Sequence, residues 1–169
     1  MRLMGVVAGS AVFLCTIGGA TLAKPTQSTT YSYYSISGET AVEIYNAMLK
    51  KGPRVDGAKA YAATSATTSQ DGKLVQAKSC QIKDYRLKLD FVIKLPRIKN
   101  ESVLPGPDRN RWRQFQAFLK THEEHHRTIW LGCAAELERK VKAIKTTSCK
   151  DADRKAAQLW TAIRAACNA

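Results

Sequence analysis

Hydrophobic residues recur at steps of three and four along residues 109–145, and this spacing predicts one long amphipathic helix. The repeating positions are Trp112, Phe115, Phe118, Leu119, His122, His126, Ile129, Trp130, Cys133, Leu137, Val141 and Ile144. An α-helix turns once every 3.6 residues, so these side chains, the two histidines included, are expected to face the core. Asp108 is the expected helix cap, and a break near Gly132 remains open.

Shorter patterns predict the rest of an α+β fold. Strands are expected over residues 30–36, 58–68, 74–82 and 85–95, with turns at Asp71-Gly72 and Lys83-Asp84. Helical spacing marks residues 39–50 and, at the end of the chain, residues 149–167. We therefore expect a small antiparallel sheet packed against the long helix and the C-terminal helix.

The first residues predict export. Residues 1–23 begin with Arg2, continue as a long apolar run and end in Thr21-Leu22-Ala23, which is typical of a cleaved signal peptide. An uncleaved membrane anchor is the alternative. Residues 24–169 then form a single exported domain. In that oxidising setting four of its cysteines predict two disulfides, with three possible connectivities.

Basic residues outnumber acidic ones by 27 to 14, for a formal net charge of +13. Loss of residues 1–23, whose one charged side chain is Arg2, lowers this charge to +12. Such a surface attracts anionic partners such as an envelope surface, although a solvated charged face explains it equally well. No aromatic and basic interleaving typical of a nucleic-acid module is present, so no specific nucleic acid is expected as a partner.

The chemistry of the chain is concentrated in His122-Glu123-Glu124-His125-His126. Histidines four residues apart lie on one face of a helix, so both imidazoles can reach one metal ion. The glutamate that follows the first histidine is then placed to accept a proton from an activated water. This His-Glu-x-x-His spacing is typical of zinc metalloproteases. The alternative is a pair of hydrogen-bonded core histidines without a metal.

The chain resembles a bacterial family of unknown function whose members are described as predicted secreted zinc-dependent proteases. The resemblance covers about residues 31–149 and rests on segments in a fixed order: Tyr34-Ser35-Ile36-Ser37-Gly38, Gly52-Pro53, Ala62-Ala63-Thr64, Cys80-Gln81-Ile82, Leu95-Pro96, residues 112–118 and residues 122–126. It implies a zincin-like fold, zinc as cofactor, a peptide or protein substrate, and a place in the periplasm or outside the cell of a bacterium.

The resemblance also implies roles for individual residues. His122 and His126 become zinc ligands and Glu123 the general base. A disulfide is implied between Cys80 and Cys149, which leaves Cys133 and Cys167 to form the second one.

A third protein ligand is not evident, because no histidine follows His126 in this sequence. Catalytic zinc ordinarily has three protein ligands and a water. Glu136 is the first candidate, although it reaches the histidines only if the helix breaks at Gly132; Asp151, Asp153, a thiolate and His125 are the others. Arg127, Tyr85 and a tyrosine of the first strand are candidates for stabilising an oxyanion.

The expected function is therefore zinc-dependent peptide hydrolysis. Two alternatives remain: a relative that kept the fold and the histidines but lost turnover, and a basic protein that binds the envelope or another polyanion.

Overall fold

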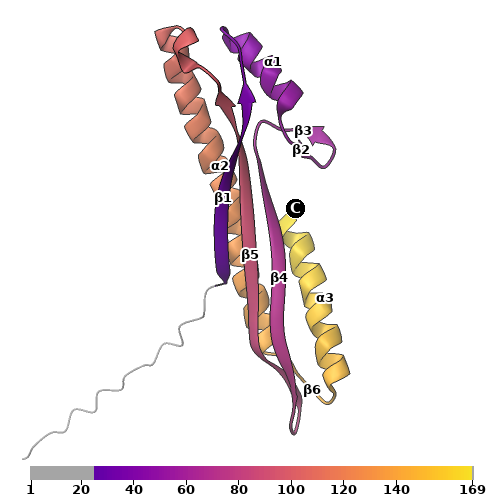
Figure 1. The fold of residues 1–169 in the computed structure, drawn as a ribbon. Helices are drawn as coiled ribbons and strands as arrows, with labels where there is room; N and C mark the ends of the chain where they lie inside the picture. The colour runs from indigo at the N-terminus through magenta and orange to yellow at the C-terminus, as the bar shows by residue number, and fades with distance from the viewer. Residues whose placement is uncertain (1–24, 169) are drawn as a thin grey trace, which may run out of the picture.

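A computed structural model of the protein describes residues 25–168, in which three helices pack against one main sheet (Figure 1). The expected α+β class is confirmed. The main sheet contains β1 (Thr26–Ile36), β4 (Ala63–Gln76), β5 (Cys80–Ile98) and the short β6 (Lys145–Thr146); the helices are α1 (Ala41–Lys51), α2 (Gly106–Lys142) and α3 (Cys149–Asn168). A small hairpin of β2 (Arg54–Val55) and β3 (Ala58–Lys59) and a 3-10 turn (Glu101–Val103) complete the described chain.

The sheet is mixed, which corrects the predicted antiparallel sheet. Its strand order is β1-β5-β4, with β6 paired to β5. β4 and β5 form an antiparallel hairpin, whereas β1 runs parallel to β5 from Thr26 beside Lys88 to Ile36 beside Ile98. Parallel neighbours need a long connection, and α1, the β2–β3 hairpin and β4 supply it here. Residue alternation reveals which face of a strand is buried and not the direction of its neighbour.

The three strands predicted over residues 58–95 correspond mainly to two long strands, β4 and β5, and residues 58–59 belong to the separate short strand β3. Asp71-Gly72, expected as a turn, lies inside β4, where the pairing register shifts between Asp71 and Lys73. Lys83-Asp84 lies inside β5, and Asp84 has a φ of 55°. A bulge or a single left-handed residue bends a strand without ending it, so neither dipeptide reverses the chain.

α2 continues through Gly132 without a break and spans 37 residues, a length of about 55 Å. Its N-cap is Pro105 rather than the expected Asp108, which lies in the first turn, where a carboxylate interacts favourably with the helix dipole. The first strand begins at Thr26, earlier than predicted, and the other helix ends agree with prediction to within a few residues. No helix within residues 25–168 is both long and apolar enough to cross a membrane.

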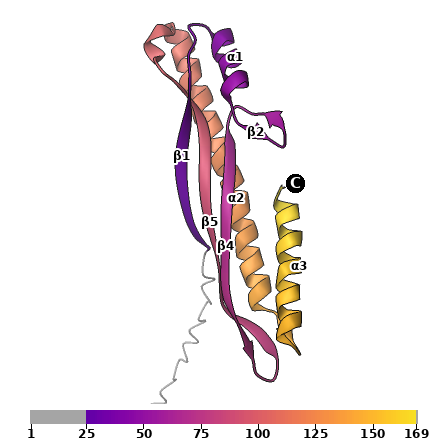
Figure 2. The same ribbon diagram turned by 45° about the vertical axis from the view of Figure 1, so that its right-hand side comes forward.

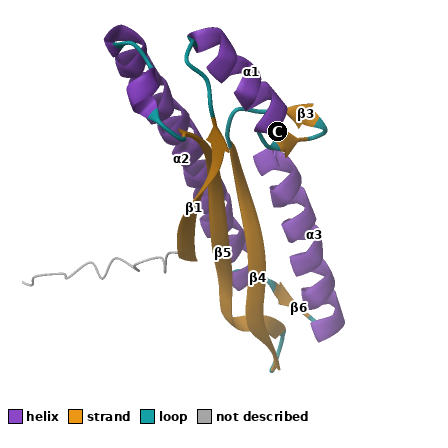
Figure 3. Cartoon of the chain, turned by 45° about the horizontal axis from the view of Figure 1, so that its top comes forward, coloured by secondary structure: helices purple, strands orange, loops and turns teal. Residues whose placement is uncertain are grey.

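The core lies between one face of the sheet and the two helices α2 and α3 (Figure 2). Alternate residues of β5 point into it, among them Leu87, Leu89 and Phe91, and they meet Leu137 and Val141 of α2. α1 packs at the other end of the sheet, where a second cluster includes Ile36, Met48 and Trp112. The strands and α2, seen in Figure 3, therefore form two packed layers, and this packing fixes where residues 122–126 lie along the sheet.

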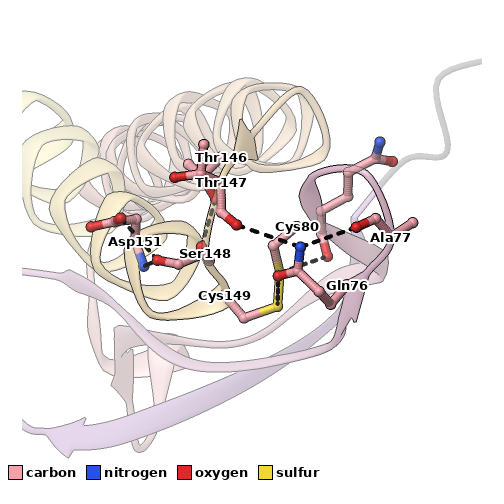
Figure 4. Close-up of a disulfide and its surroundings, with 9 residues drawn as sticks. Gln76, Ala77, Cys80, Thr146, Thr147, Ser148, Cys149 and Asp151 are labelled. Atoms are coloured by element: carbon pink, nitrogen blue, oxygen red, sulfur yellow. Dashed lines mark hydrogen bonds between the residues drawn. A yellow bond between two sulfur atoms is a disulfide. The ribbon is translucent and has the colours of Figure 1, made fainter.

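Two disulfides attach α3 to the rest of the domain. Cys80 at the start of β5 is bonded to Cys149 at the start of α3, beside the point where β6 pairs with β5 (Figure 4). Cys133 in α2 is bonded to Cys167 near the end of α3. This is the pairing that the family resemblance implied. The predicted signal peptide lies outside the described residues.

Candidate functional site

The motif lies near the middle of α2, and its histidines face solvent. His122 and His126 are exposed, whereas Glu123 between them is only 5% exposed. The prediction that both histidines face the core is therefore wrong, and the buried member of the motif is its carboxylate.

The arrangement of α3 explains the exposure of the histidines. His126 precedes Cys133 by seven residues, two helical turns, and so lies on the same flank of α2. α3 packs along the half of α2 that follows the motif and is bonded to it at Cys133. The motif lies beyond that bond, where Phe118 and Ile129 also remain 62% and 41% exposed. The apolar stripe of α2 is thus wider than the surface that covers it.

The two imidazoles converge at their outer nitrogens. His122 Nε2 and His126 Nε2 are 3.2 Å apart, and the rings are nearly perpendicular, at 84°. The ring of Phe118 stacks on His122, with 6.1 Å between the ring centres. This stacking restrains the orientation of His122. In the absence of a metal, the same separation allows one neutral ring to donate a hydrogen bond to the other.

The convergence also fits two ligands of one zinc ion. Ring nitrogens 2.0–2.1 Å from a tetrahedral zinc lie about 3.4 Å from each other. The observed Nε2 separation of 3.2 Å is close to that value. Solvent exposure of both rings leaves the metal-facing side open. The distance between the two nitrogens therefore matches the one expected of two ligands of a single zinc ion.

Glu123 is held against β4 by a hydroxyl that the sequence analysis did not single out. Thr64 Oγ1 lies 2.8 Å from Glu123 Oε2 and 3.0 Å from the backbone oxygen of Glu123. Oε1 has no hydrogen-bond partner within residues 25–168 and is not sealed from solvent. One carboxylate oxygen is thus anchored to the sheet and the other remains able to accept a proton.

The sequence gives only a weak indication of the role of Thr64. Alternation places Ala62, just before β4, and Thr64, Ala66 and Thr68 of β4 on the face that meets α2. The hydroxyls on this face were therefore candidate partners for a buried polar group of the helix. The register between β4 and α2, which local sequence patterns do not reveal, makes Thr64 the partner of Glu123.

The structure does not bring Glu136 to the two histidines. α2 is unbroken at Gly132, so Glu136 lies ten residues, about 15 Å, along the helix from His126. Its carboxylate is paired with Arg139 at 2.7 Å and Lys140 at 3.2 Å. Hydrogen bonds from these two cations lower the pKa of Glu136 to about 2.

The other candidate ligands are either bound to other groups or placed on other parts of the two helices. Asp151 accepts from Ser148 and Arg154 at the far end of the α2–α3 hairpin, and these contacts lower the pKa of its carboxyl. Asp153 follows on the same turn of α3, all four cysteines named above are in disulfides, and His125 is exposed on another side of α2. Among residues 25–168 no group of three or more metal-ligating side chains gathers.

The proposed oxyanion stabilisers do not face the histidines. Arg127 donates to Thr29 of β1 at 3.2 Å, and Tyr31 of β1 donates to Glu124. That hydrogen bond is the main reason that the pKa of Tyr31 is raised. Tyr85 donates to Gln70 in the other half of the sheet. The contacts of Arg127 and Tyr31 fasten α2 to β1, whereas that of Tyr85 joins β5 to β4.

The comparisons with known proteins identify a family. The family model described as "Bacterial protein of unknown function (DUF922)" matches residues 31–169. No curated protein and no solved structure matches. Because the match covers most of the chain, this protein belongs to the bacterial DUF922 family.

Proposed function

We propose that this protein is an exported zinc-dependent peptidase that hydrolyses peptide bonds. The observation that carries the proposal is the 3.2 Å convergence of His122 Nε2 and His126 Nε2 at the solvent-exposed flank of α2. Between them in sequence, Glu123 offers a carboxylate anchored at one oxygen. His122 and His126 would hold the metal. Zinc, when bound, lowers the pKa of a coordinated water to about 7 and polarises a carbonyl.

Glu123 supplies the proton transfer in this proposal. Its Oε2 accepts from Thr64, which fixes the carboxylate plane against β4. Its Oε1 is left to take a proton from the attacking water and to pass it to the leaving amine. Burial of the remainder of the side chain limits its rotation, so the basic oxygen is oriented before substrate arrives.

β4 is the strand that we propose aligns the substrate. It is an edge strand of the main sheet, and it carries Thr64 beside the motif. Residues 63–70 of this strand bear no charge. An uncharged strand edge offers unpaired backbone groups to an extended peptide. A peptide paired there would run past the Glu123 end of the motif.

Export is part of the proposal for two reasons. Residues 1–23 have the pattern of a signal peptide. The cysteines of the described domain are paired two by two, as suits an oxidising compartment.

A second candidate function has its own observation. Within residues 25–168 no third protein ligand lies beside the two histidines. A relative that binds zinc weakly and has lost turnover would have this ligand set.

Hydrolysis of a fluorescently labelled, unfolded protein substrate separates the two candidates. The peptidase proposal expects zinc-dependent turnover that falls at least about a hundredfold in Glu123→Gln. Glu124→Gln is the matched control, because Glu124 is the adjacent carboxylate and contacts Tyr31 on the other flank. It should retain most of the activity. Zinc-loaded wild type without turnover would support the degenerate relative, and equal losses in both variants would refute the role of Glu123.

A further inference from the structure

A basic groove lies on the flank of α2 opposite the histidine pair. It is a hollow of about 590 Å³ between the C-terminal ends of β1 and β5 and the first half of α2. Figure 1 shows the ends of β1 and β5 near the first half of α2, in the upper part of the view. The residues of the groove used below are Tyr33, Arg97, Lys99, Asn100, Arg113 and Lys120. Lys120 lies over the ring of Tyr31 in β1, on the side of α2 that faces away from Cys133.

Charge in the groove is unbalanced. Four cationic side chains, Arg97, Lys99, Arg113 and Lys120, line it against one carboxylate, Glu101. Glu101 is engaged by Arg113 at 3.2 Å, and Lys120 lies 3.9 Å from Glu124 outside the groove. Within residues 25–168 neither Arg97 nor Lys99 has a carboxylate partner. Two cations are therefore free to bind an anion.

The Arg97 guanidinium is already oriented. It lies over the ring of Tyr33, with 3.7 Å between its central carbon and the ring centre. Stacking on an aromatic face fixes the plane of the guanidinium while its N–H groups remain available at the edges. A planar fork of donors held in this way matches the paired oxygens of a carboxylate or a phosphate.

Neutral donors extend the site. Asn100 accepts from Ser102 through Oδ1, at 3.0 Å from the backbone nitrogen and 2.7 Å from the hydroxyl. This leaves Asn100 Nδ2 without a hydrogen-bond partner in residues 25–168. The groove thus combines two unpaired cations, of which the Arg97 guanidinium is preoriented, with a free amide donor.

The number of cations favours phosphate. A single carboxylate carries one negative charge, whereas a phosphomonoester carries about −1.5 to −2 near pH 7 with three acceptor oxygens. Lysine ammonium groups bind phosphate as point charges and arginine adds the bidentate contact. The volume of about 590 Å³ exceeds that of a lone phosphate, so the rest of the ligand has room.

We infer that this groove binds a phosphorylated ligand, with a phosphomonoester or diphosphate group against Arg97, Lys99 and the Asn100 amide. The site is separate from the histidine pair and does not depend on zinc. The phosphate can belong to a soluble molecule or to the headgroup of an anionic lipid, and binding experiments distinguish these sources.

Titration of residues 24–169 with inorganic pyrophosphate, and sedimentation with phosphatidic acid vesicles, test the inference. The variant Arg97→Glu/Lys99→Glu reverses the two unpaired cations. Lys73→Glu/Lys78→Glu is its matched control, because it changes net charge equally on exposed residues of the β4–β5 hairpin. We expect saturable binding to at least one probe, weakened about tenfold or more by the groove variant and less than about threefold by the control.

The outcomes separate cleanly. Pyrophosphate binding that depends on the groove assigns a soluble ligand, and vesicle binding alone assigns a lipid headgroup. Equal losses in both variants would mean that net charge alone drives binding and would overturn the inference, as would wild type that binds neither probe. Citrate bound as tightly as pyrophosphate would overturn the choice of phosphate. Arg97→Gln provides a milder test if the double reversal fails to fold.

Discussion

Removal of the Thr64 hydroxyl should destabilise the domain because it leaves the buried carboxylate of Glu123 without its hydrogen-bond donor. Thr64→Val keeps the shape of the side chain but cannot donate to Glu123, which is 5% exposed and accepts this hydrogen bond at 2.8 Å. The second acceptor, the Glu123 backbone oxygen at 3.0 Å, shares the same hydroxyl proton, so one hydrogen bond is lost rather than two.

The size of the loss follows from the charge of the acceptor. A hydrogen bond to a charged group contributes about 1.5–3 kcal/mol, so we expect Thr64→Val to lower the free energy of unfolding by about 2 kcal/mol. Thr64→Ser retains the hydroxyl and loses one methyl group, at about 0.8 kcal/mol if that methyl is buried. In a Glu123→Gln background the acceptor is neutral, and Thr64→Val should cost only about 1 kcal/mol.

Urea unfolding followed by tryptophan fluorescence, with disulfides intact, measures these differences. The informative quantity is the coupling energy of the Thr64→Val and Glu123→Gln cycle. If Thr64→Val costs no more than Thr64→Ser, or costs the same whether residue 123 is charged or neutral, then Thr64 does not hold Glu123 in solution.

Two further predictions concern the stability of the domain. Serine replacement of Cys80 and Cys149, which are 69 residues apart, should lower the free energy of unfolding by about 4.4 kcal/mol through loop entropy. The same replacement of Cys133 and Cys167, which are 34 residues apart, should lower it by about 3.8 kcal/mol. The opposite order in urea unfolding would contradict this prediction. Glu136→Gln should lower stability at neutral pH and low salt, and the gap to wild type should close as pH falls from about 4.5 to about 2, because the folded-state pKa of Glu136 is depressed to about 2. A gap unchanged at pH 2 would exclude the contacts with Arg139 and Lys140 as its cause.

Periodic patterns predicted the helices and strands themselves better than they predicted how the strands pair. The spacing of apolar residues from Trp112 to Val141 predicted α2 because a helix imposes its own period on every contact. The alternation in β5 likewise predicted a half-buried strand. The direction of β1 and the continuity of β4 through Asp71-Gly72 were missed, because pairing across a sheet depends on chain segments far apart in sequence.

The site was predicted in part for the same reason. Four-residue spacing brings His122 and His126 together in any helix, and the structure has their nitrogens 3.2 Å apart. Which side of the helix is buried depends on where α3 and β4 lie. That tertiary placement exposes the histidines and buries Glu123 against Thr64, and neither follows from local spacing. The distance of Glu136, in contrast, follows from the ten helical residues that separate it from His126 once α2 is unbroken at Gly132.

Zinc content of the folded, disulfide-bonded protein tests the proposed metal site most directly. Residues 24–169, prepared without chelator and titrated with zinc, should bind about one ion per chain. Binding should persist in His125→Ala, whose histidine lies on another side of α2, and should be lost in His122→Ala and in His126→Ala. Wild type that folds and binds no zinc, or binding lost equally in His125→Ala, would contradict the proposal.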